Sequence, residues 1–443
     1  MPADSAEHIA TALTASLLAG EFTRAEVLRR TEEMLGPLSR RAQRSLVRQL
    51  FLKLPASYPP SPEWLKAFFL QELAYTRAIK RVAQRPDYVH QVLTPARFAP
   101  IAKFADLDIP RLPTVGDLAV WLRVELNDLD WFADQKRQHD RTRIPVLQNY
   151  NYALIPKRNG DLRLIEQPKP RLKTIQRRIL HGILDHVPVH DRAFGFVSGR
   201  SCIDGAMEHA GHAVVASCDI SNFFPTTRAS RIHALFRSLG YPWAVARLLT
   251  GLVTTTTPRS VLKRLPHTQR FSAEHIYLRP HLAQGAPTSP ALANLCAWRL
   301  DCRLTGLAAS FNVTYTRYAD DMTFSGGALL GARADALLRA VTEIVSDEGW
   351  FLNTKKTRIM RPHVRQQVTG IVINKRLNVP RAEFDLLKAT LHNAVRLGWH
   401  SQDRAGHPDF RAHLDGRIRW VERLNQLRGE KLRHLFAQID WTA

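Results

Sequence analysis

The sequence predicts an α+β protein built from two or three structural units, and three observations lead to that class. The chain has 443 residues, which exceeds the ~100–200 residues of an ordinary single domain. Hydrophobic residues make up 45% of the sequence and charged residues 23%, a composition typical of globular rather than disordered proteins. From about Thr114 onward, short β-prone runs alternate irregularly with helical periodicity. That order favours α+β over a regular parallel α/β array.

The first 110 residues are predicted to be helical and contain no recognisable catalytic pattern. Thr23 and Glu26 have the spacing of a capping box, which opens a helix. Ser61 and Pro62 suit the N-cap and the first position of a later helix. The predicted helices cover residues 9–18, 23–36, 40–54 and 63–83.

A β-hairpin is predicted at residues 150–166, because two alternating apolar runs flank a turn that contains Asn159 and Gly160. Further β-prone runs cover residues 213–219, 313–318, 322–325, 358–360 and 367–373. Helices are predicted at residues 117–134 (one or two), 172–187, 229–253 (a pair), 290–308, 333–348, 381–397 and 417–439. The last of these is basic and amphipathic, which by itself indicates only that it packs against something.

The charge balance points to a polyanionic partner. Lysine and arginine number 63 against 40 aspartates and glutamates, a formal net charge of +23. Nucleic acid and an acidic membrane surface are the two polyanions that such a surface would meet, and a purely solubilising charge is the plainer alternative. No basic helix pairs with a broad face rich in tryptophan and phenylalanine, which disfavours the membrane surface.

The four cysteines include no C-x-x-C pair, so reduced, buried thiols are expected rather than a disulfide scaffold or a zinc ribbon. The N-terminus lacks the basic start and apolar core of a signal peptide. The sequence contains no window of ~18 uncharged apolar residues, the length needed to cross a membrane. We therefore expect a cytoplasmic protein with no membrane partner.

Two adjacent aspartates, Asp320 and Asp321, lie between β-prone runs, where a tight hairpin would hold both carboxylates at its tip. Like charges side by side are costly unless a cation neutralises them. Carboxylate oxygens of this kind suit Mg²⁺, which binds through one or two carboxylates plus substrate phosphates. A solvent-exposed Asp-Asp turn would have the same local sequence.

A third carboxylate, Asp219, ends a buried-looking strand and is followed by Phe223 and Phe224. Beside the first pair it would complete a site for two metal ions ~3.5–4 Å apart. One ion would activate a 3′-hydroxyl and the other would neutralise the leaving pyrophosphate. The loop at residues 284–290, Gln-Gly-Ala-Pro-Thr-Ser-Pro, leads into a helix, and its small residues would let a backbone or a base approach closely.

These three elements, in this order, resemble palm motifs A, B and C of reverse transcriptases. Residues 317–326, Arg-Tyr-Ala-Asp-Asp-Met-Thr-Phe-Ser-Gly, and residues 368–370, Val-Thr-Gly, resemble those of bacterial retron reverse transcriptases. The resemblance covers about residues 112–443. It implies a right-hand polymerase fold of fingers, palm and thumb with an all-helical N-terminal extension. The implied domains are residues 1–110 (extension), 111–365 (fingers and palm) and 366–443 (thumb).

The resemblance also implies a role for each matching residue. Asp219, Asp320 and Asp321 match the catalytic, metal-binding triad, and Ile220 adjoins the metal through its backbone. Phe224 matches the steric gate that blocks a 2′-hydroxyl. The remaining residues matched to nucleotide binding are Gln284, Gly285, Arg163, Lys157 and Lys356. Lys356 is matched to a proton donor to pyrophosphate, although the neighbouring Lys355 could occupy that motif position instead. The guanidinium of Arg163 would offer two parallel N–H donors to the phosphate oxygens of a triphosphate.

Two further retron features concern RNA. The family's Asn-Ala-x-x-His element corresponds here to Gly205 through His209, so the asparagine is replaced and the histidine is kept. His212 lies three residues on, but without further ligands RNA contact or packing is favoured over zinc. Val368, Thr369 and Gly370 match a thumb-side segment associated with recognition of the cognate RNA.

The function implied by the family is an RNA-directed DNA polymerase that copies part of its own structured noncoding RNA into single-stranded DNA from dNTPs. A guanosine 2′-hydroxyl would prime the reaction, and a separate effector protein would act with the product in anti-phage defence. The alternatives are a group II intron-like or abortive-infection reverse transcriptase. From another class, the chain could be a non-catalytic RNA-binding scaffold. A group II enzyme would be expected to continue past the thumb, and an abortive-infection enzyme to have eroded Tyr-x-Asp-Asp or Gln-Gly segments.

Overall fold

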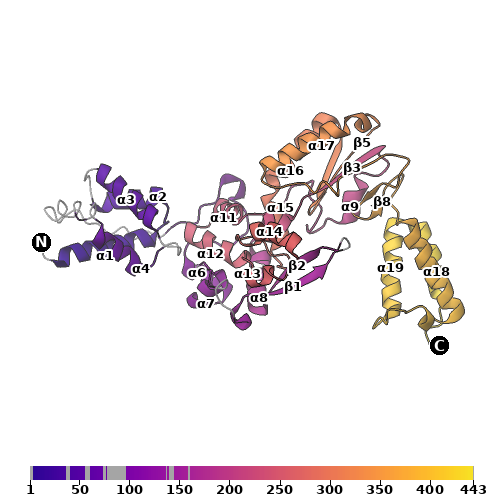
Figure 1. Ribbon diagram of the computed structural model, residues 1–443, viewed down its shortest axis with the longest axis horizontal. Helices are drawn as coiled ribbons and strands as arrows, with labels where there is room; N and C mark the ends of the chain where they lie inside the picture. The colour runs from indigo at the N-terminus through magenta and orange to yellow at the C-terminus, as the bar shows by residue number, and fades with distance from the viewer. Residues whose placement is uncertain are drawn as a thin grey trace. The chain divides into compact units, whose positions relative to one another are not determined.

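The computed structural model describes residues 3–35, 40–54, 60–72, 76, 96–135, 137–138, 144–157 and 160–442. The chain forms two compact units, the first from Met1–Pro188 with Phe224–Cys296 and the second from Val189–Phe223 with Ala297–Ala443. Figure 1 labels many of the helices and strands of both units. Among the described helices, none combines the length and the apolar character needed to span a bilayer.

The described N-terminal part of the first unit is helical, as the sequence predicts, and contains α1 (Ala3–Ala19), α2 (Arg24–Leu35), α3 (Arg40–Lys53) and α4 (Pro62–Gln71). Their apolar faces share one core that includes Leu13, Leu50 and Phe69 (Figure 1). The hydroxyl of Ser61 accepts a hydrogen bond from the backbone of Trp64, which caps α4. This helix ends at Gln71, earlier than predicted, and residues 73–75 and 77–83 of the prediction lie outside the described residues.

The rest of the first unit contains one β-hairpin among helices. Strands β1 (Tyr150–Pro156) and β2 (Leu162–Pro168) pair antiparallel, which confirms the predicted hairpin. The helices are α6 (Val115–Leu122), α7 (Leu126–Ala133), α8 (Pro170–Gly182), α10 (Phe223–Thr226), α11 (Ala229–Ser238), α12 (Trp243–Val253), α13 (Arg259–Leu262), α14 (His267–Tyr277) and α15 (Ser289–Cys296), with 3-10 turns at Ala102–Phe104, Pro145–Leu147 and Leu184–His186. Helices α13 and α14 were not predicted, and each follows a proline that stands at its N-cap.

The second unit is built on an antiparallel sheet in the order β4-β5-β3-β6. Its strands are β3 (Val214–Asp219), β4 (Thr314–Tyr318), β5 (Asp321–Gly326) and β6 (Arg358–Met360). Alternate residues of β3 face opposite sides: Val214 approaches α17 (Leu329–Asp347), and Val215 joins a core with α9 (Cys202–Met207). Both faces are therefore covered, and the strand ends carry the polar groups.

The elements from α15 onward correct three predictions. The helix predicted at 290–308 is divided at Ala297 into α15 and α16 (Trp298–Phe311). The helix predicted at 417–439 is α19 (Phe410–Leu424) and α20 (Gln426–Ala437), because the side chain of Asn425 caps α20 by accepting from the backbone of Arg428. The strand predicted at 367–373 is a small hairpin of β7 (Gln367–Val368) and β8 (Ile371–Val372). Helix α18 (Arg381–Leu397) and a 3-10 turn at Trp399–Ser401 complete the unit.

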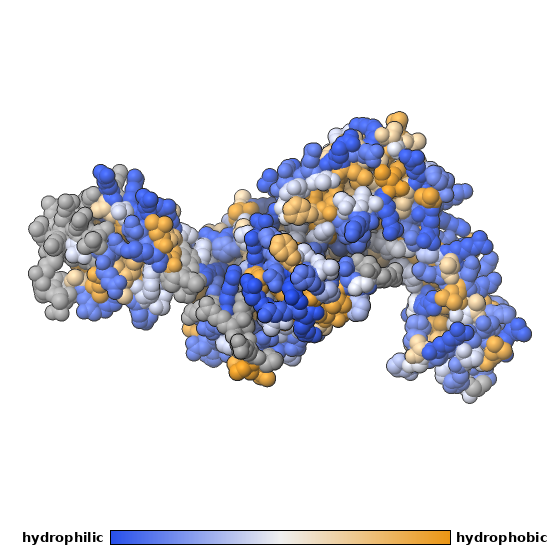
Figure 2. All heavy atoms as spheres, viewed as in Figure 1, coloured by the Kyte–Doolittle hydropathy of each residue, from blue (hydrophilic) through white to orange (hydrophobic). Residues whose placement is uncertain are grey.

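The surface shown in Figure 2 is largely hydrophilic, and the cysteines form no disulfides. Hydrophilic residues cover much of the face shown in Figure 2, with apolar patches between them. All four cysteines are free, as predicted. They are not all buried, because Cys302 on α16 is exposed to solvent.

Candidate active site

A two-residue turn joins β4 to β5 and places the paired aspartates at its tip. Tyr318 pairs with Asp321 across the ladder, so Ala319 and Asp320 form the turn. Ala319 has φ of 56°, the left-handed region that a turn of this kind requires. The predicted hairpin with both carboxylates at its end is therefore present.

Strand β3 brings the third carboxylate to the same place. Asp219 is the register partner of Asp321, and the backbone N–H of Ile220 donates to the carbonyl of Asp320 at 3.0 Å. Asp219 is buried, as is Ile220. Asp219, about 100 residues earlier in the sequence, thus lies with Asp320 and Asp321 at one end of the sheet.

The electrostatics of this cluster call for a cation. Burial, together with the charges of Asp219 and Asp321, raises the pKa of Asp320 to about 6. Burial and the charge of Asp219 also raise the pKa of Asp321 above its ordinary value. Positive charge placed among the three carboxylates would remove this penalty.

Lys356 supplies one such charge. Its Nζ lies 2.8 Å from Oδ2 of Asp219. The segment that carries it is fixed against the end of β3, where the N–H of Asn353 donates to the carbonyl of Asp219 at 2.7 Å. Burial alone would lower the pKa of Lys356, but the hydrogen bond to Asp219 and the three carboxylate charges raise it. Of the two neighbouring lysines, Lys356 is the one that contacts the triad.

A cavity of about 500 Å³ opens beside these groups. Its lining combines carboxylates with cationic side chains and includes Asp219, Asp321, Lys356, Arg358 and Arg365. The two arginines were missed by the sequence reasoning, although the basic run around Lys355 and Lys356 was a signal for them. Guanidinium groups at these positions can bind phosphate oxygens of a substrate.

Behind the turn lies a buried ion pair that the sequence reasoning also missed. The guanidinium of Arg317 makes two hydrogen bonds to Asp301, of 2.8 and 2.6 Å, and both side chains are fully buried. Its third nitrogen donates to the carbonyl of Ala319 at 2.9 Å. Gly195 approaches the same turn so closely that a Cβ there would lie 2.6 Å from the nitrogen of Ala319. The turn is therefore held from two sides.

Comparison with known proteins shows what this geometry belongs to. Residues 155–384 match the family model described as reverse transcriptase (RNA-dependent DNA polymerase). The chain is 39% identical over 332 residues to the retron Mx65 reverse transcriptase of Myxococcus xanthus, covering 75% of this chain and 73% of that protein. It is 36% identical to the retron Mx162 reverse transcriptase of the same organism (64% and 59% covered) and 32% identical to the retron Ec86 reverse transcriptase of Escherichia coli (52% and 65% covered).

The chain belongs to the retron-type reverse transcriptases. It is therefore an RNA-directed DNA polymerase with the polymerase fold, and enzymes of this family use divalent metal ions. The gathered carboxylates of the second unit are the part of this reverse transcriptase that fits such ions.

The predicted nucleotide-binding residues Arg163, Gln284 and Gly285 lie in the first unit. Arg163 is exposed on β2. The N–H of Glu166 on the same strand donates to the carbonyl of Gln284 at 3.0 Å. Gly285 has φ of 140°, and a Cβ there would lie 2.8 Å from the carbonyl oxygen of Glu166, so the loop needs glycine at this position.

Two more of the predicted nucleotide-binding residues, Lys157 and Phe224, belong to the first unit. Lys157 is half-buried and opens the hairpin turn, where its N–H donates to the carbonyl of Asp161 at 2.7 Å. Phe224 is half-buried on α10, five positions after Asp219 in the sequence. The roles of both residues toward a nucleotide stay predictions.

His209 is fully buried in the reverse transcriptase. One ring nitrogen lies 2.7 Å from the hydroxyl of Ser325 and the other 2.7 Å from that of Thr316. Nδ1 of His212 lies within hydrogen-bond distance of the same hydroxyl, at 2.6 Å. This arrangement favours packing, the second of the two roles expected for His209, over direct RNA contact.

The Val-Thr-Gly element forms the small hairpin β7–β8. Val368 is buried in the core beside α9, whereas Thr369 and Gly370 form the turn with φ of 49° and 87°. Gly370 is exposed. The turn residues are thus the part of this element that is available to a partner.

The residues present fit divalent metal ions. Asp219, Asp320 and Asp321 are hard oxygen donors, and their mutual repulsion is relieved by positive charge. In the described part of the chain, no group of three or more His, Cys, Asp or Glu side chains has the closed geometry of a metal site.

Proposed function

We propose that this reverse transcriptase copies part of a cognate structured noncoding RNA into single-stranded DNA, starting from the 2′-hydroxyl of a guanosine. The product would be a branched RNA–DNA molecule. The observation that carries the proposal is the cluster of Asp219, Asp320 and Asp321 at one end of the palm sheet, in a chain 39% identical to a retron reverse transcriptase.

In the proposed reaction, the priming hydroxyl loses its proton to solvent water and its oxygen attacks the α-phosphorus of a dNTP. The bond from that phosphorus to the oxygen bridging to the β-phosphate breaks, and pyrophosphate leaves. Asp219, Asp320 and Asp321 would hold two Mg²⁺ ions, with the backbone of Ile220 beside them. When bound, the ions would lower the pKa of the hydroxyl and neutralise the departing charge. Lys356 would give a proton to the pyrophosphate.

The other proposed contacts belong to substrate binding. Arg163 would grip the triphosphate, with Lys157 a second cation at the hairpin tip. Gln284 and Gly285 would adjoin the incoming nucleotide, and Phe224 would exclude a 2′-hydroxyl.

The proposed partners follow from the family. The cognate RNA would be recognised at the thumb side, where the turn of Thr369 and Gly370 is accessible. A separate effector protein and a role in anti-phage defence complete the proposal.

The experiment that tests this function is purification of the protein from cells that carry its native locus. The nucleic acid that accompanies it is separated on a denaturing gel before and after RNase and DNase treatment, and then sequenced. We expect a discrete DNA band that shifts to lower mass with RNase and is destroyed by DNase. Heterogeneous RNA, or no nucleic acid, from the intact locus would contradict the proposal and favour another reverse transcriptase class or a scaffold.

Replacement of Phe224 by alanine should raise ribonucleotide incorporation relative to deoxynucleotide incorporation by about 10–100-fold, because the ring would no longer fill the space of a 2′-hydroxyl. Single-nucleotide extension with matched rNTP and dNTP gives the ratio. Phe224→Tyr keeps the ring and should retain the parent's preference. An unchanged ratio in Phe224→Ala would remove Phe224 as the gate.

A further inference from the structure

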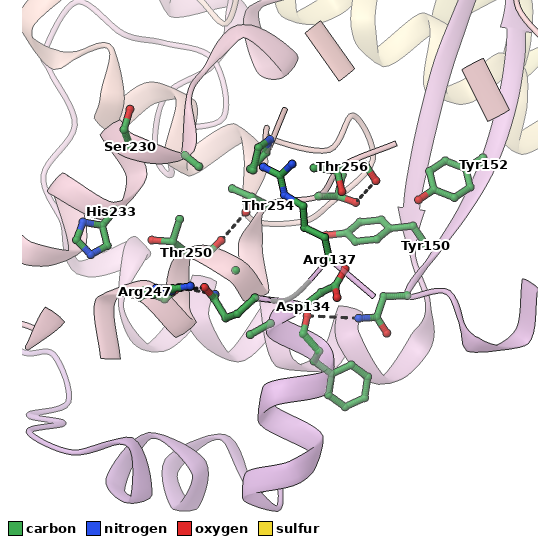
Figure 3. A pocket seen from close by; sticks show the side chains of 18 residues that line it. Asp134, Arg137, Tyr150, Tyr152, Ser230, His233, Arg247, Thr250, Thr254 and Thr256 are labelled. Atoms are coloured by element: carbon green, nitrogen blue, oxygen red, sulfur yellow. Dashed lines mark hydrogen bonds between the residues drawn. The ribbon is translucent and has the colours of Figure 1, made fainter. Parts of the chain in front are cut away.

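A second cavity, of about 410 Å³, lies in the first unit and is shown in Figure 3. This volume is within the ~300–1,000 Å³ of sites that hold small ligands. Its walls come from the end of α7, the start of β1, helices α11 and α12, and the segment at residues 254–256. None of the residues assigned above to metal or nucleotide binding lines it. On the hairpin it adjoins Tyr150, which pairs with Pro168, whereas Arg163 pairs with Ile155 near the other end.

One side of the cavity offers flat apolar surface. Tyr150 and Tyr152 alternate on β1 and so share a face of the strand, and both line the cavity in Figure 3. The hydroxyl of Tyr150 is held by the amide of Gln176 at 3.0 Å, which fixes its ring. A ring held in this way can stack with a nucleobase without a large loss of side-chain freedom.

The opposite side offers hydrogen-bond acceptors. The hydroxyl of Thr250 donates to the carbonyl of Ala246, and that of Thr254 donates to the carbonyl of Thr250, each at 2.7 Å. A hydroxyl has one donor and two lone pairs, so these oxygens have only acceptor capacity left for a ligand. The matching ligand must supply N–H or O–H donors, as the amino group of a base or a ribose 2′-hydroxyl does.

The charge of the cavity favours an anion at its edge. Arg137 is exposed, and its guanidinium has no partner among the residues that the structure describes. Figure 3 shows this side chain within the cavity. The other arginine, Arg247, is bonded to Gln135 and lies over the ring of Trp243. Among the described residues that line the cavity, Asp134 is the only carboxylate, and it accepts a hydrogen bond from the backbone N–H of Gln138 at 2.7 Å.

His233 adds an unsatisfied polar atom. Its Nε2 is buried and has no hydrogen-bond partner among the described residues. Burial, assisted by Arg237 and Arg247, lowers the pKa of His233, so the imidazole is neutral at neutral pH. A neutral ring nitrogen can pair with one further polar group of a ligand.

We propose that this cavity binds one nucleotide of an RNA strand, with the base against Tyr150 and Tyr152, its donors on the threonine oxygens, and a phosphate on Arg137. RNA is the occupant that the observations favour, because the acceptors suit a 2′-hydroxyl and the enzyme already acts on RNA. The proposal does not depend on how the reaction is primed. It adds a site for RNA in the first unit, separate from the carboxylates that perform the chemistry.

The test measures binding of a labelled single-stranded RNA by fluorescence anisotropy, without divalent metal, so that no extension occurs. Arg137→Gln removes the charge at an exposed position. Ser230→Phe places a ring in the cavity from an exposed position on α11, and Ser230→Ala leaves the space open. Arg111→Gln is the charge control, because Arg111 is exposed in the same unit and does not line the cavity. Far-ultraviolet circular dichroism verifies that each variant is folded.

We expect Arg137→Gln and Ser230→Phe to weaken RNA binding by about tenfold, the change expected when one stacked nucleotide is lost. Ser230→Ala and Arg111→Gln should bind as the parent does. DNA of the same sequence should bind less tightly to the parent, and its affinity should change less in Arg137→Gln.

Equal affinity in all variants would overturn the proposal, as would equal losses in Arg137→Gln and Arg111→Gln. If Ser230→Phe does not fold, the two arginine variants decide the outcome. AMP binding that depends on Arg137, with unchanged RNA affinity, would show a free-nucleotide site instead.

Discussion

Asp320→Asn is expected to reduce primer extension on an RNA template by on the order of 10³-fold or more, because it removes a charged metal ligand. The substitution keeps the shape of the side chain. It also removes one of three like charges, and the raised pKa of Asp320 shows that the folded protein bears a cost for that charge. The variant should therefore melt at the parent's temperature or above it. Activity would fall without a loss of stability, which a structural role could not produce.

The matched control is Asp335→Asn, since Asp335 is exposed on α17 of the same unit. That variant should extend primers as the parent does. RNA affinity is measured for both variants by filter binding and should stay close to the parent's. Parent-like extension by Asp320→Asn would contradict the assignment of the triad. Loss of RNA binding together with activity would count against a purely catalytic role.

Much of this site could be predicted because its signals are local. The turn at Ala319 and Asp320 lies between two β-prone runs. Strand β3 ends in Asp219, and its register against β5 brings this carboxylate beside Asp321. The hairpin β1–β2 has the same basis, as an Asn-Gly turn between alternating runs predicts a two-stranded element. Where the local pattern is complete, the structure agrees with it.

The failures have an equally definite cause. Helical periodicity continues through Ala297 and Asn425, but whether Asn425 stays inside a helix or caps the next one depends on the packing of its neighbours. His209 sits in a sequence element associated with RNA, and its burial arises from contacts with Ser325 and Thr316, more than 100 positions away. Arg358 lines the cavity beside the triad because β6 pairs with β3, and Arg365 lines it from the segment that follows β6. Each of these features depends on contacts between distant segments.

The ion pair of Asp301 and Arg317 is the strongest case of such a contact, and its removal is expected to have the largest effect on stability. Asp301→Asn should lower the free energy of unfolding by about 3–5 kcal/mol, because the guanidinium would be left buried without its counter-charge. Urea unfolding followed by fluorescence measures this change. The control is Asp128→Asn, which breaks an exposed pair with Arg171 of 2.7 Å and should cost about 0–1 kcal/mol. A loss in Asp301→Asn no larger than that of the control would contradict the prediction.

A double variant separates stability from positioning. Asp301→Leu with Arg317→Met replaces both charges by apolar side chains, an exchange that is often neutral or stabilising in a buried site. It should therefore recover most of the stability lost in Asp301→Asn. It would not recover the hydrogen bond from Arg317 to the carbonyl of Ala319, which holds the turn that carries Asp320. We therefore expect a folded protein whose kcat for primer extension remains below the parent's, with little change in KM for dNTP. Parent-like kcat in the double variant would show that the ion pair stabilises the fold without positioning the catalytic turn.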